Sequence, residues 1–434
     1  MAVQKQALRR QDGALYWEGV RLSALLQAGL TTPFYVYSEA ELQRNWQRYE
    51  VATAGLDATI GYAVKANNNP VLLAQLARWG AGAIVVSEHE LRHAIRCGFP
   101  TSRMLLHGNG KRQVDLDAAL AAGVRLSADS EFDLQHIEAR AAALGTRAEV
   151  LLRVNPDIDA QVHPYISTGL LDSKFGMPQR VLCALLPQLK ALRHTHIRGL
   201  HCHLGSTLKS VQPVRDAAAV LLPLLQLLRT EGHPIDTLDL GGGLGIDYYR
   251  SATATPESES QQTAPDLLSS LTPLFAELCQ QGLRLWLEPG RSIVASAGAL
   301  LSRVIGCKQS GAKNFLVTDA SMAQLIRPCL YQAYHHIELL ETPADSTQKT
   351  YDVVGPICES SDFLGLARQL PTPQEGDGLL IFDTGAYGFA MASRYNMHLL
   401  CAEYLISGET LRLIRRAETY EDLAQTFADQ PVSI

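Results

Sequence analysis

A regular alternation of short apolar runs with helix-like segments, between residues 60 and 288, constrains the fold more than any other feature. Eight runs have the length of a buried strand, and each is followed by a helical pattern or by a loop long enough to contain one. The runs are Ile60–Ala66, Ala83–Ser87, Met104–Gly108, Val124–Ala128, Glu149–Asn155, Ile197–Leu204, Thr237–Gly241 and Leu283–Glu288. Alternating strands and helices are typical of a parallel sheet. Eight units over roughly 230 residues predict a (β/α)8 barrel, and a doubly wound open sheet, which more often has about five or six strands, is the alternative.

Two stretches interrupt this alternation. Residues Pro156–Gly176 form a long insertion after the fifth run, and we expect an ordered loop over the mouth of the barrel. The segment Ser251–Pro265 is polar and compositionally biased, which is typical of a surface loop.

The pattern changes near residue 297 to short runs rich in β-branched and aromatic residues, which predict a separate all-β domain. These runs are Phe315–Thr318, Tyr351–Val354, Leu379–Asp383, Leu399–Ile406 and Leu411–Ile414. The alternating segments Ala14–Trp17 and Phe34–Tyr37 precede the barrel and need a sheet to pair with. The sequence therefore predicts an N-terminal segment over residues 1–35 that joins the β-domain, a barrel over residues 36–297 and a C-terminal β-domain over residues 298–434.

Charge and composition argue against several classes of partner. The 434 residues carry a formal net charge of −6 without a basic stripe, so we expect neither nucleic acid nor a membrane surface as a partner. The longest apolar run, Ala217–Leu225, is far too short to span a bilayer, and the N-terminus has no apolar core like that of a secretory signal. The eight cysteines show no paired spacing, which predicts no metal site and a cytoplasmic location.

Polar residues and glycines follow nearly every predicted barrel strand. They are Lys65, His107–Asn109, Asp129–Ser130, Arg153, Asn155, His201–Ser206, Gly241–Gly243 and Glu288–Arg291. Barrel enzymes place their chemistry at the carboxyl ends of the strands. Because core packing does not require polar residues at all of these positions, the pattern predicts an active site.

Lys65 is the first candidate at this end of the barrel. A lysine near the carboxyl end of a buried strand loses its proton readily, which makes its amine suitable for a Schiff base. The alternative is a lysine whose stem packs against the strand while its ammonium reaches water.

Three further elements are ambiguous when each is taken alone. Gly241–Gly243 can bring bare backbone N–H groups close to an anion, or can form a tight turn. Glu288 and Arg291 can serve a ligand, or can form a structural ion pair, and His203 can be an ordinary core histidine. Together with one lysine, they are what pyridoxal phosphate requires: an amine, a carboxylate for the ring nitrogen, a flat imidazole and a phosphate cradle.

Longer motifs carry a resemblance that extends from about residue 32 to about residue 423. The chain resembles the fold-type III pyridoxal-phosphate-dependent decarboxylases in Tyr62–Asn67, His201–Ser206, Gly241–Gly245, Glu288–Arg291, Gly355–Ser360 and Gly385–Gly388. Within them it is most similar to the diaminopimelate decarboxylases, through His163–Gly169, Ser173–Gly176 and Leu325–Tyr331.

The resemblance implies a role for each cofactor-binding residue. Lys65 would bind the cofactor covalently, His203 would stack on its ring, and Glu288 would meet the pyridine nitrogen. The remaining cofactor contacts implied are Ser206, Gly243, Gly290 and Arg291 around the phosphate, and Tyr387.

The resemblance also implies a substrate site shared between two subunits of a homodimer. Arg291, Arg327, Tyr331 and Tyr387 would contact the amino-acid substrate, with Arg327 and Tyr331 suited to a carboxylate. Cys358 and Glu359 would reach in from the other subunit. Cys358, the third catalytic candidate beside Lys65 and His203, would protonate the carbon that loses carbon dioxide, and Glu359 would hold the distal amine. A buried, inert cysteine is the alternative for Cys358.

The activity implied is decarboxylation of meso-2,6-diaminopimelate to L-lysine and carbon dioxide. The alternatives are a same-fold decarboxylase of ornithine, arginine, lysine or a carrier-linked amino acid, an amino-acid racemase, and a non-catalytic binding protein. The sequence departs from the family pattern at Ser87–Leu91 and at Tyr395–Leu400, and neither stretch contains a residue with an implied role.

Overall fold

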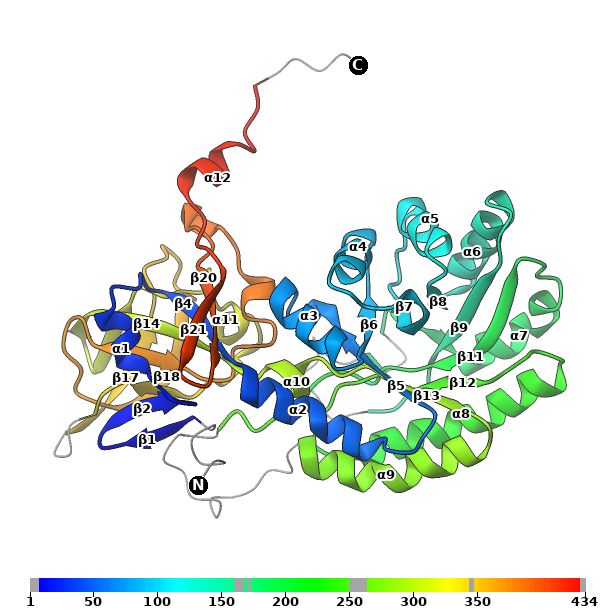
Figure 1. Cartoon of the computed structure of the whole chain (residues 1–434), viewed down its shortest axis with the longest axis horizontal. Helices are drawn as coiled ribbons and strands as arrows, with labels where there is room; N and C mark the ends of the chain where they lie inside the picture. The colour runs from blue at the N-terminus through cyan, green and yellow to red at the C-terminus, as the bar shows by residue number, and fades with distance from the viewer. Residues whose placement is uncertain (1–7, 160–167, 170–172, 250–263, 343–346, 430–434) are drawn as a thin grey trace. The chain divides into compact units, whose positions relative to one another are not determined.

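The computed structural model describes residues 8–159, 168–169, 173–249, 264–342 and 347–429 (Figure 1). Contacts divide the chain into two units. The first is built mainly from residues 45–247 and ends at residue 293, and the second combines the segment up to residue 44 with the chain from residue 294.

The first unit is a closed parallel barrel, which confirms the predicted fold. Its strands are β5 (Ala58–Ala63), β6 (Gly82–Val85), β7 (Met104–Leu106), β8 (Arg125–Ala128), β9 (Ala148–Asn155), β11 (Thr195–His201), β12 (Thr237–Asp239) and β13 (Arg284–Leu287). Neighbouring strands follow the order β9, β11, β12, β13, β5, β6, β7 and β8, and pairing of β8 with β9 closes the ring. The short strand β10 (Met177–Pro178) adds to β9.

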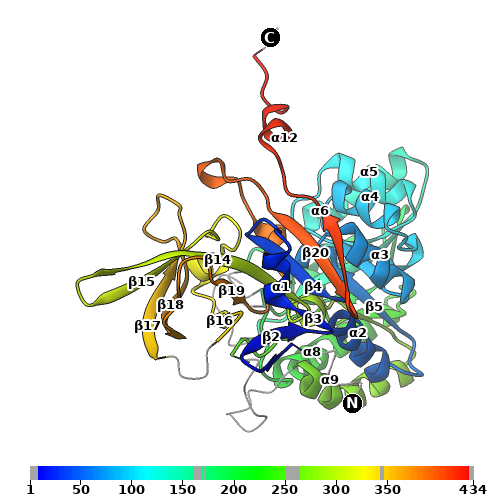
Figure 2. The same ribbon diagram turned by 60° about the vertical axis from the view of Figure 1, so that its left-hand side comes forward.

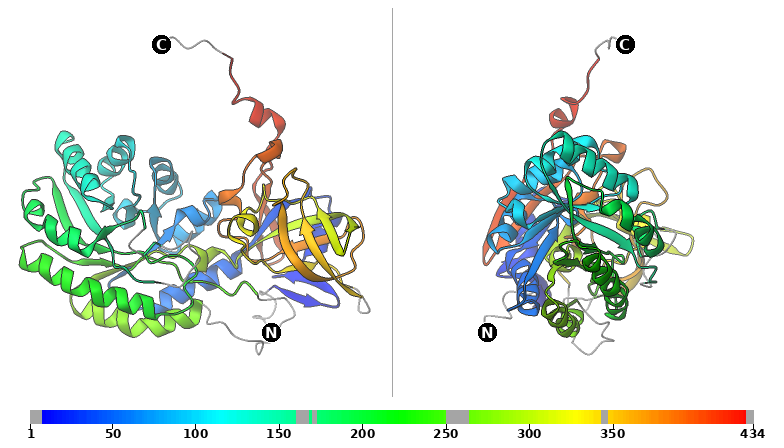
Figure 3. Two further views of the ribbon diagram at one scale, coloured as in Figure 1. Left: turned by 180° about the vertical axis from the view of Figure 1, so that it is seen from behind. Right: turned by 90° about the vertical axis from the view of Figure 1, so that its right-hand side faces the viewer.

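Helices surround the strands as an outer layer (Figure 3). They are α2 (Glu39–Ala52), α3 (Pro70–Arg78), α4 (Glu88–Arg96), α5 (Gln113–Ala121), α6 (Glu131–Ala143), α7 (Gln179–Leu189), α8 (Gln212–Thr230), α9 (Ala264–Gln280) and α10 (Arg291–Val294), with 3-10 turns η1 (Val64–Ala66) and η2 (Thr101–Arg103). Side-chain caps start several of them where the sequence has Ser or Asn. Asn69 accepts from the backbone of Val71 at α3, and Ser87 accepts from Glu90 at α4.

The barrel interior is filled by side chains from several strands. Ile84, Leu105, Leu151 and Trp286 form one buried cluster contributed by β6, β7, β9 and β13. Such packing makes the barrel a core rather than a pore, so that ligands are confined to its ends.

The second unit is dominated by one large sheet (Figure 2). Its strands are β4 (Phe34–Ser38), β14 (Gly298–Ser310), β15 (Lys313–Thr318), β16 (Ile337–Leu339), β17 (Gln348–Val354), β18 (Phe363–Pro371), β19 (Gly378–Ile381), β20 (Ala402–Ser407) and β21 (Thr410–Arg415). The main order is β18, β17, β15, β14, β4, β20 and β21, while β19 pairs with both β14 and β16.

The N-terminal segment joins this unit in two ways. Strand β4 pairs with β14 and β20 along its length, so a domain boundary between residues 35 and 36 would cut through it. Strands β1 (Arg9–Gln11), β2 (Ala14–Trp17) and β3 (Val20–Arg21) form a small sheet of their own, which is tied to the chain after β16 by a hydrogen bond from Leu15 N to Leu340 O.

The second unit is mainly β rather than purely β. It also contains α1 (Leu22–Gln27), α11 (Arg327–Tyr331), α12 (Tyr420–Ala424) and the 3-10 turns η4 (Phe389–Met391) and η5 (Tyr395–Met397). Much of the two loops expected at Pro156–Gly176 and Ser251–Pro265, including most of the His163–Gly169 motif, lies outside the described residues. No helix among the residues that the structure describes is long and apolar enough to cross a membrane.

Candidate active site

Lys65 lies just beyond β5, in the 3-10 turn η1. The sequence predicted a strand as far as Ala66, but the strand ends at Ala63 and the turn carries the lysine side chain to an exposed position at the end of the barrel. The backbone at this point is anchored, because Ala63 N donates to Pro289 O at 2.9 Å. The amine is thus held by a rigid segment without being buried.

His203 and Glu288 come from the ends of β11 and β13. The Nδ1 atom of His203 accepts a hydrogen bond from the backbone N–H of Gly242 at 3.2 Å and lies 3.8 Å from Glu288 Oε2. Burial, aided by the ammonium of Lys65, lowers the pKa of His203 to about 3. His203 is therefore a neutral imidazole near neutral pH, suited to stacking and not to accepting a proton.

An anion cradle forms where the loops after β11, β12 and β13 meet. The Arg291 guanidinium is buried, and its Nε and Nη2 atoms donate to Ser206 Oγ at 3.0 and 2.9 Å. Gly243 has a φ of +97°, and a Cβ there would lie 2.1 Å from Gly205 O. Any side chain at residue 243 would force these loops apart. Gly290 similarly permits close packing, since its Cβ would lie 2.9 Å from the Cβ of Ala66.

Four buried titratable groups meet beneath this cradle: His107, His201, Asp239 and Glu288. One nitrogen or oxygen atom of each lies within 4.8 Å of the others. His107 Nε2 is 2.6 Å from Glu288 Oε1, and His201 Nε2 is 3.7 Å from Glu288 Oε2. Residues of these types could also hold a metal ion. The sequence singled out His107, His201 and Glu288 at these strand ends and gave a role only to Glu288. It did not single out Asp239.

Electrostatics separate the protonation states of these groups. Burial lowers the pKa of His107 and lowers that of His201 strongly. Burial also raises the pKa of Asp239 well above its usual range, and the Glu288 carboxylate adds to this. For Glu288, burial is outweighed by the imidazoles of His107 and His201, which hold its pKa well below the ordinary value.

Lys111 is a further residue that the sequence reasoning missed. Its buried ammonium donates to Gly108 O at 2.8 Å, to Ser127 O at 2.6 Å and to Asp133 Oδ2 at 2.6 Å. These bonds fasten the loop after β7 to the end of β8 and to α6, which fixes the chain next to His107. The sequence feature that could have identified Lys111 is its position shortly after a predicted strand, next to Gly108 and Gly110.

Arg327 and Tyr331 lie on the short helix α11 of the second unit. Arg327 is 4% exposed, and its Nη1 donates to His335 Nε2 at 2.8 Å. His335 in turn donates from Nδ1 to Phe382 O at 2.8 Å. The guanidinium also lies over the ring of Tyr248, 5.0 Å from its centroid. Because one nitrogen of His335 accepts and the other donates, this histidine is neutral, and it aims the guanidinium of Arg327. Tyr331 is half-buried.

Cys358 and Glu359 are both exposed, in the loop between β17 and β18. The loop is anchored on Asp362, whose Oδ2 accepts from Ile357 N at 2.8 Å. The backbone N–H of Cys358 donates to Asn396 Oδ1 at 2.9 Å. This contact gives a role to Asn396, which the sequence reasoning did not assign. Cys358 is therefore not the buried cysteine of the alternative interpretation. Tyr387, in the loop after β19, is half-buried and has a φ of +57°.

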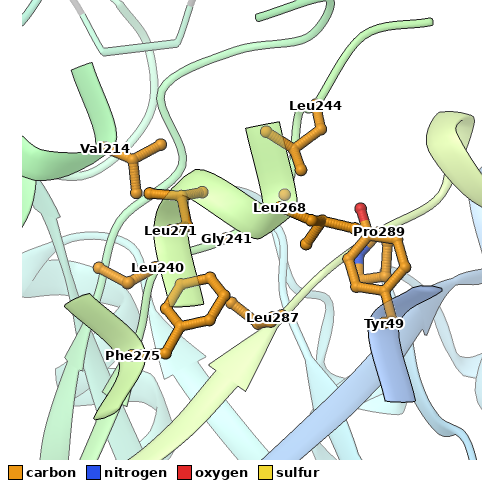
Figure 4. Close-up of a pocket in the computed structure, with 11 residues that line it drawn as sticks. Tyr49, Val214, Leu240, Gly241, Leu244, Leu268, Leu271, Phe275, Leu287 and Pro289 are labelled. Atoms are coloured by element: carbon orange, nitrogen blue, oxygen red, sulfur yellow. The ribbon is translucent and has the colours of Figure 1, made fainter. Parts of the chain in front are cut away.

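An apolar cavity of about 330 Å³, including its opening, lies behind the glycine loop (Figure 4). It is lined by Tyr49, Val214, Leu240, Gly241, Gly242, Leu244, Leu268, Leu271, Phe275, Leu287 and Pro289. None of the charged groups described above lines it, but Gly242, whose N–H donates to His203, borders both this cavity and the polar site.

Comparison with known proteins places the chain in a family. Residues 39–295, more than half of the chain, match the model of the pyridoxal-dependent decarboxylase pyridoxal-binding domain. A probable chloroplastic diaminopimelate decarboxylase of Oryza sativa is 44% identical over 98% of this chain and 85% of its own length. The diaminopimelate decarboxylase of Aquifex aeolicus is 39% identical over 97% of both chains. The chain belongs to the diaminopimelate decarboxylase family. A crystal structure of the M. jannaschii diaminopimelate decarboxylase with L-lysine has a TM-score of 0.89 at 32% identity and covers 98% of both chains.

The barrel residues of this family member fit pyridoxal phosphate. The buried Arg291 and the Ser206 hydroxyl offer donors to a phosphate beside a glycine loop with no room for side chains. The ionised Glu288 matches a protonated ring nitrogen, and Lys65 offers an accessible amine. The predicted set of Lys65, His203, Ser206, Gly243, Glu288, Gly290 and Arg291 thus lies at one end of the barrel, while Tyr387 belongs to the second unit.

Proposed function

We propose that this chain catalyses the decarboxylation of meso-2,6-diaminopimelate to L-lysine and carbon dioxide with pyridoxal phosphate. The observation that carries the proposal is the convergence of Lys65, His203, Glu288 and Arg291 at one barrel end, in a chain that matches diaminopimelate decarboxylases over nearly its whole length. Pyridoxal phosphate supplies a ring that accepts the electron pair left when the carboxyl carbon departs.

The barrel residues would each perform one task around that cofactor. The Lys65 amine would hold it covalently, and Ser206 and Arg291 would bind its phosphate. Glu288 would keep the ring nitrogen protonated, because its carboxylate is ionised despite burial. His203 would cover the ring with a neutral face.

Recognition of the substrate's distal end would rest on Arg327 and Tyr331. Diaminopimelate has a distal carboxylate that lysine, ornithine and arginine lack. A guanidinium that is almost fully buried and held by His335 is suited to bind such a group, since charge-assisted bonds are strongest where water is excluded. Glu359 would hold the distal amine, while Arg291 and Tyr387 would contact the substrate near the cofactor.

Arg327→Ala is expected to lower kcat/KM for diaminopimelate by about 30-fold to 1,000-fold, because loss of a desolvated charged contact costs on the order of 2 to 4 kcal/mol. Steady-state kinetics of carbon dioxide release would measure the loss. The exposed Arg412 is a matched control, and Arg412→Ala should retain wild-type kinetics. A folded Arg327→Ala enzyme with wild-type kinetics would remove Arg327 from substrate recognition.

His335→Ala is expected to raise KM for diaminopimelate by about 10-fold while changing kcat less, because Arg327 loses the acceptor that aims it. His335→Gln, which keeps an amide acceptor and donor, should recover part of the loss. An equal effect on KM and kcat in both variants, with lowered thermal stability, would mean that His335 acts only in folding.

Cys358 and Glu359 would serve the active site of a second subunit in a homodimer. Both are exposed in this chain, on a loop that hydrogen bonds hold in shape. The residues on either side of the anchoring Asn396 are exposed and apolar: Tyr395 is 45% and Met397 54% accessible. Such a surface beside a rigid loop is suited to a subunit interface. The Cys358 thiol would then donate its proton to the carbon that has lost carbon dioxide.

The activity itself is tested by incubating purified, cofactor-loaded protein with meso-diaminopimelate, lysine, ornithine and arginine in turn, while released carbon dioxide is measured. We expect release from diaminopimelate alone, with L-lysine as the product. Release from another amino acid, or racemisation without release, would replace the proposed function by the corresponding alternative.

A further inference from the structure

We propose that His107, His201 and Asp239 are positioning residues: three buried, uncharged groups that surround the Glu288 carboxylate and hold it in place with their N–H and O–H groups. This inference rests on the proposed cofactor-binding role of Glu288, but it does not depend on which amino acid is decarboxylated. The three residues follow or end three different strands, β7, β11 and β12, and Glu288 follows a fourth, β13. The four are between 0% and 8% exposed.

Both histidines bring a ring nitrogen close to the Glu288 carboxylate. His107 Nε2 lies 2.6 Å from Glu288 Oε1, and neither atom has a hydrogen-bond partner among the described residues, so a small turn of the ring would let Nε2 donate to the carboxylate. The Nδ1 atom of His201 lies 3.2 Å from the Ser127 hydroxyl. If Ser127 donates, the proton of His201 sits on Nε2, the atom that lies 3.7 Å from Glu288 Oε2. The two imidazole rings pack edge to face with centroids 4.3 Å apart, an arrangement that two cations would oppose.

Asp239 completes the arrangement. It is fully buried, and its Oδ1 accepts from the backbone N–H of Gly241 at 2.8 Å. Its Oδ2 has no hydrogen-bond partner among the groups that the structure describes, and an oxygen of the Glu288 carboxylate lies within 4.8 Å of an oxygen of Asp239. Two ionised carboxylates in such a site would repel each other, so one must keep its proton. The directions of the pKa shifts place that proton on Asp239, which can then donate to Glu288.

A bound metal ion is the competing explanation for two imidazoles and two carboxylates in one place. Ligands of one zinc ion, each about 2.0 to 2.2 Å from it in tetrahedral geometry, lie roughly 3.4 Å from one another. The 2.6 Å separation of His107 Nε2 and Glu288 Oε1 is much shorter than that. The separation therefore favours a carboxylate held by neighbouring donors over a metal site.

The consequence is a carboxylate that can neither take up a proton nor turn away from the ring nitrogen. Without donors, burial would favour the protonated form of Glu288. Loss of one donor should thus weaken the interaction between Glu288 and the protonated ring nitrogen of the cofactor. The affinity of the protein for the cofactor measures this change directly.

The experiment measures the dissociation constant of pyridoxal phosphate for apoprotein by fluorescence titration, in paired variants. His107→Leu and Asp239→Leu remove a donor and should weaken binding by at least about 10-fold. His107→Gln and the isosteric Asp239→Asn keep an uncharged donor and should remain within about threefold of the wild type. Thermal unfolding of each apoprotein shows which variants are folded, and Asp239→Asn tests the proposal even if Asp239→Leu does not fold.

Three results would overturn the proposal. Unchanged affinity in a folded His107→Leu protein would show that the donors do not act on the cofactor. An Asp239→Asn variant that binds at least about 10-fold more weakly than the wild type would show that Asp239 is not an uncharged donor. Stoichiometric zinc binding by the wild-type apoprotein, abolished in Asp239→Asn, would establish the metal site instead. A wild type that binds the cofactor but does not act on diaminopimelate would refute the proposed function and leave this inference standing.

Discussion

Replacing Lys65 with alanine is expected to abolish the visible absorption of the covalently held cofactor and to lower kcat by about 1,000-fold or more. Lys65 lies in a turn whose backbone is bonded to Pro289, and its side chain is exposed at the barrel end that holds His203 and Glu288. No other lysine is predicted to hold the cofactor. Absorption spectroscopy and single-turnover measurements with diaminopimelate would record both losses.

Lys190→Ala is the matched control for this experiment. Lys190 is exposed at the carboxyl end of α7, where it pairs with Glu231, and this position precedes a barrel strand instead of following one. It should keep the visible spectrum and the rate of the wild type. If Lys65→Ala also kept both, the central assignment would be wrong.

Two inactive variants, Lys65→Ala and Cys358→Ala, are expected to restore activity when they are mixed. If Cys358 serves the partner's site, a mixed dimer has one site with both defects and one site with neither. Random mixing makes about half of the dimers heterodimers, so activity should recover to about a quarter of the wild type. Co-expression with two different affinity tags would isolate the heterodimers, and their carbon dioxide release should be about half that of the wild type, because one of their two sites is intact.

The control for the thiol is Cys307→Ala, which removes an exposed cysteine on β14 and should remain active by itself. Verified heterodimers without activity would place Cys358 in the site of its own subunit. Full activity of Cys358→Ala alone would show that the thiol is not needed for catalysis. This variant would then no longer test whether the two subunits share an active site.

The eight barrel strands could be predicted because a strand buried on both faces is a continuous apolar run, which the helices interrupt at regular intervals. In the second unit, β14 and β18 were missed for a related reason. The first half of β14, from Gly298, is buried, whereas the residues after Cys307 are exposed, so the strand shows neither one apolar run nor a clean alternation. Strand β18 likewise has an exposed middle around Ala367.

Lys65 shows how far the local sequence can predict the surroundings of a single residue. The apolar run around it predicted a strand reaching Ala66, but β5 ends at Ala63, where the N–H of that residue bonds to Pro289 and the chain enters a 3-10 turn. A hydrogen bond to a residue so distant in sequence leaves no trace in the local pattern. Lys65 remains a predicted site residue, and its exposed side chain differs from the buried strand end that the apolar run predicted.

By itself, the sequence determined the barrel, the β-rich second unit and the residue types at the carboxyl ends of the strands, because apolar periodicity and strand-end polarity are local properties. Only the tertiary structure decided which of those residues meet. Closure of β8 onto β9 and the register of the strands bring His107, His201 and Asp239 around Glu288. Their protonation states follow from shared burial and short separations, which depend on the packed barrel and not on the neighbours of any residue along the chain.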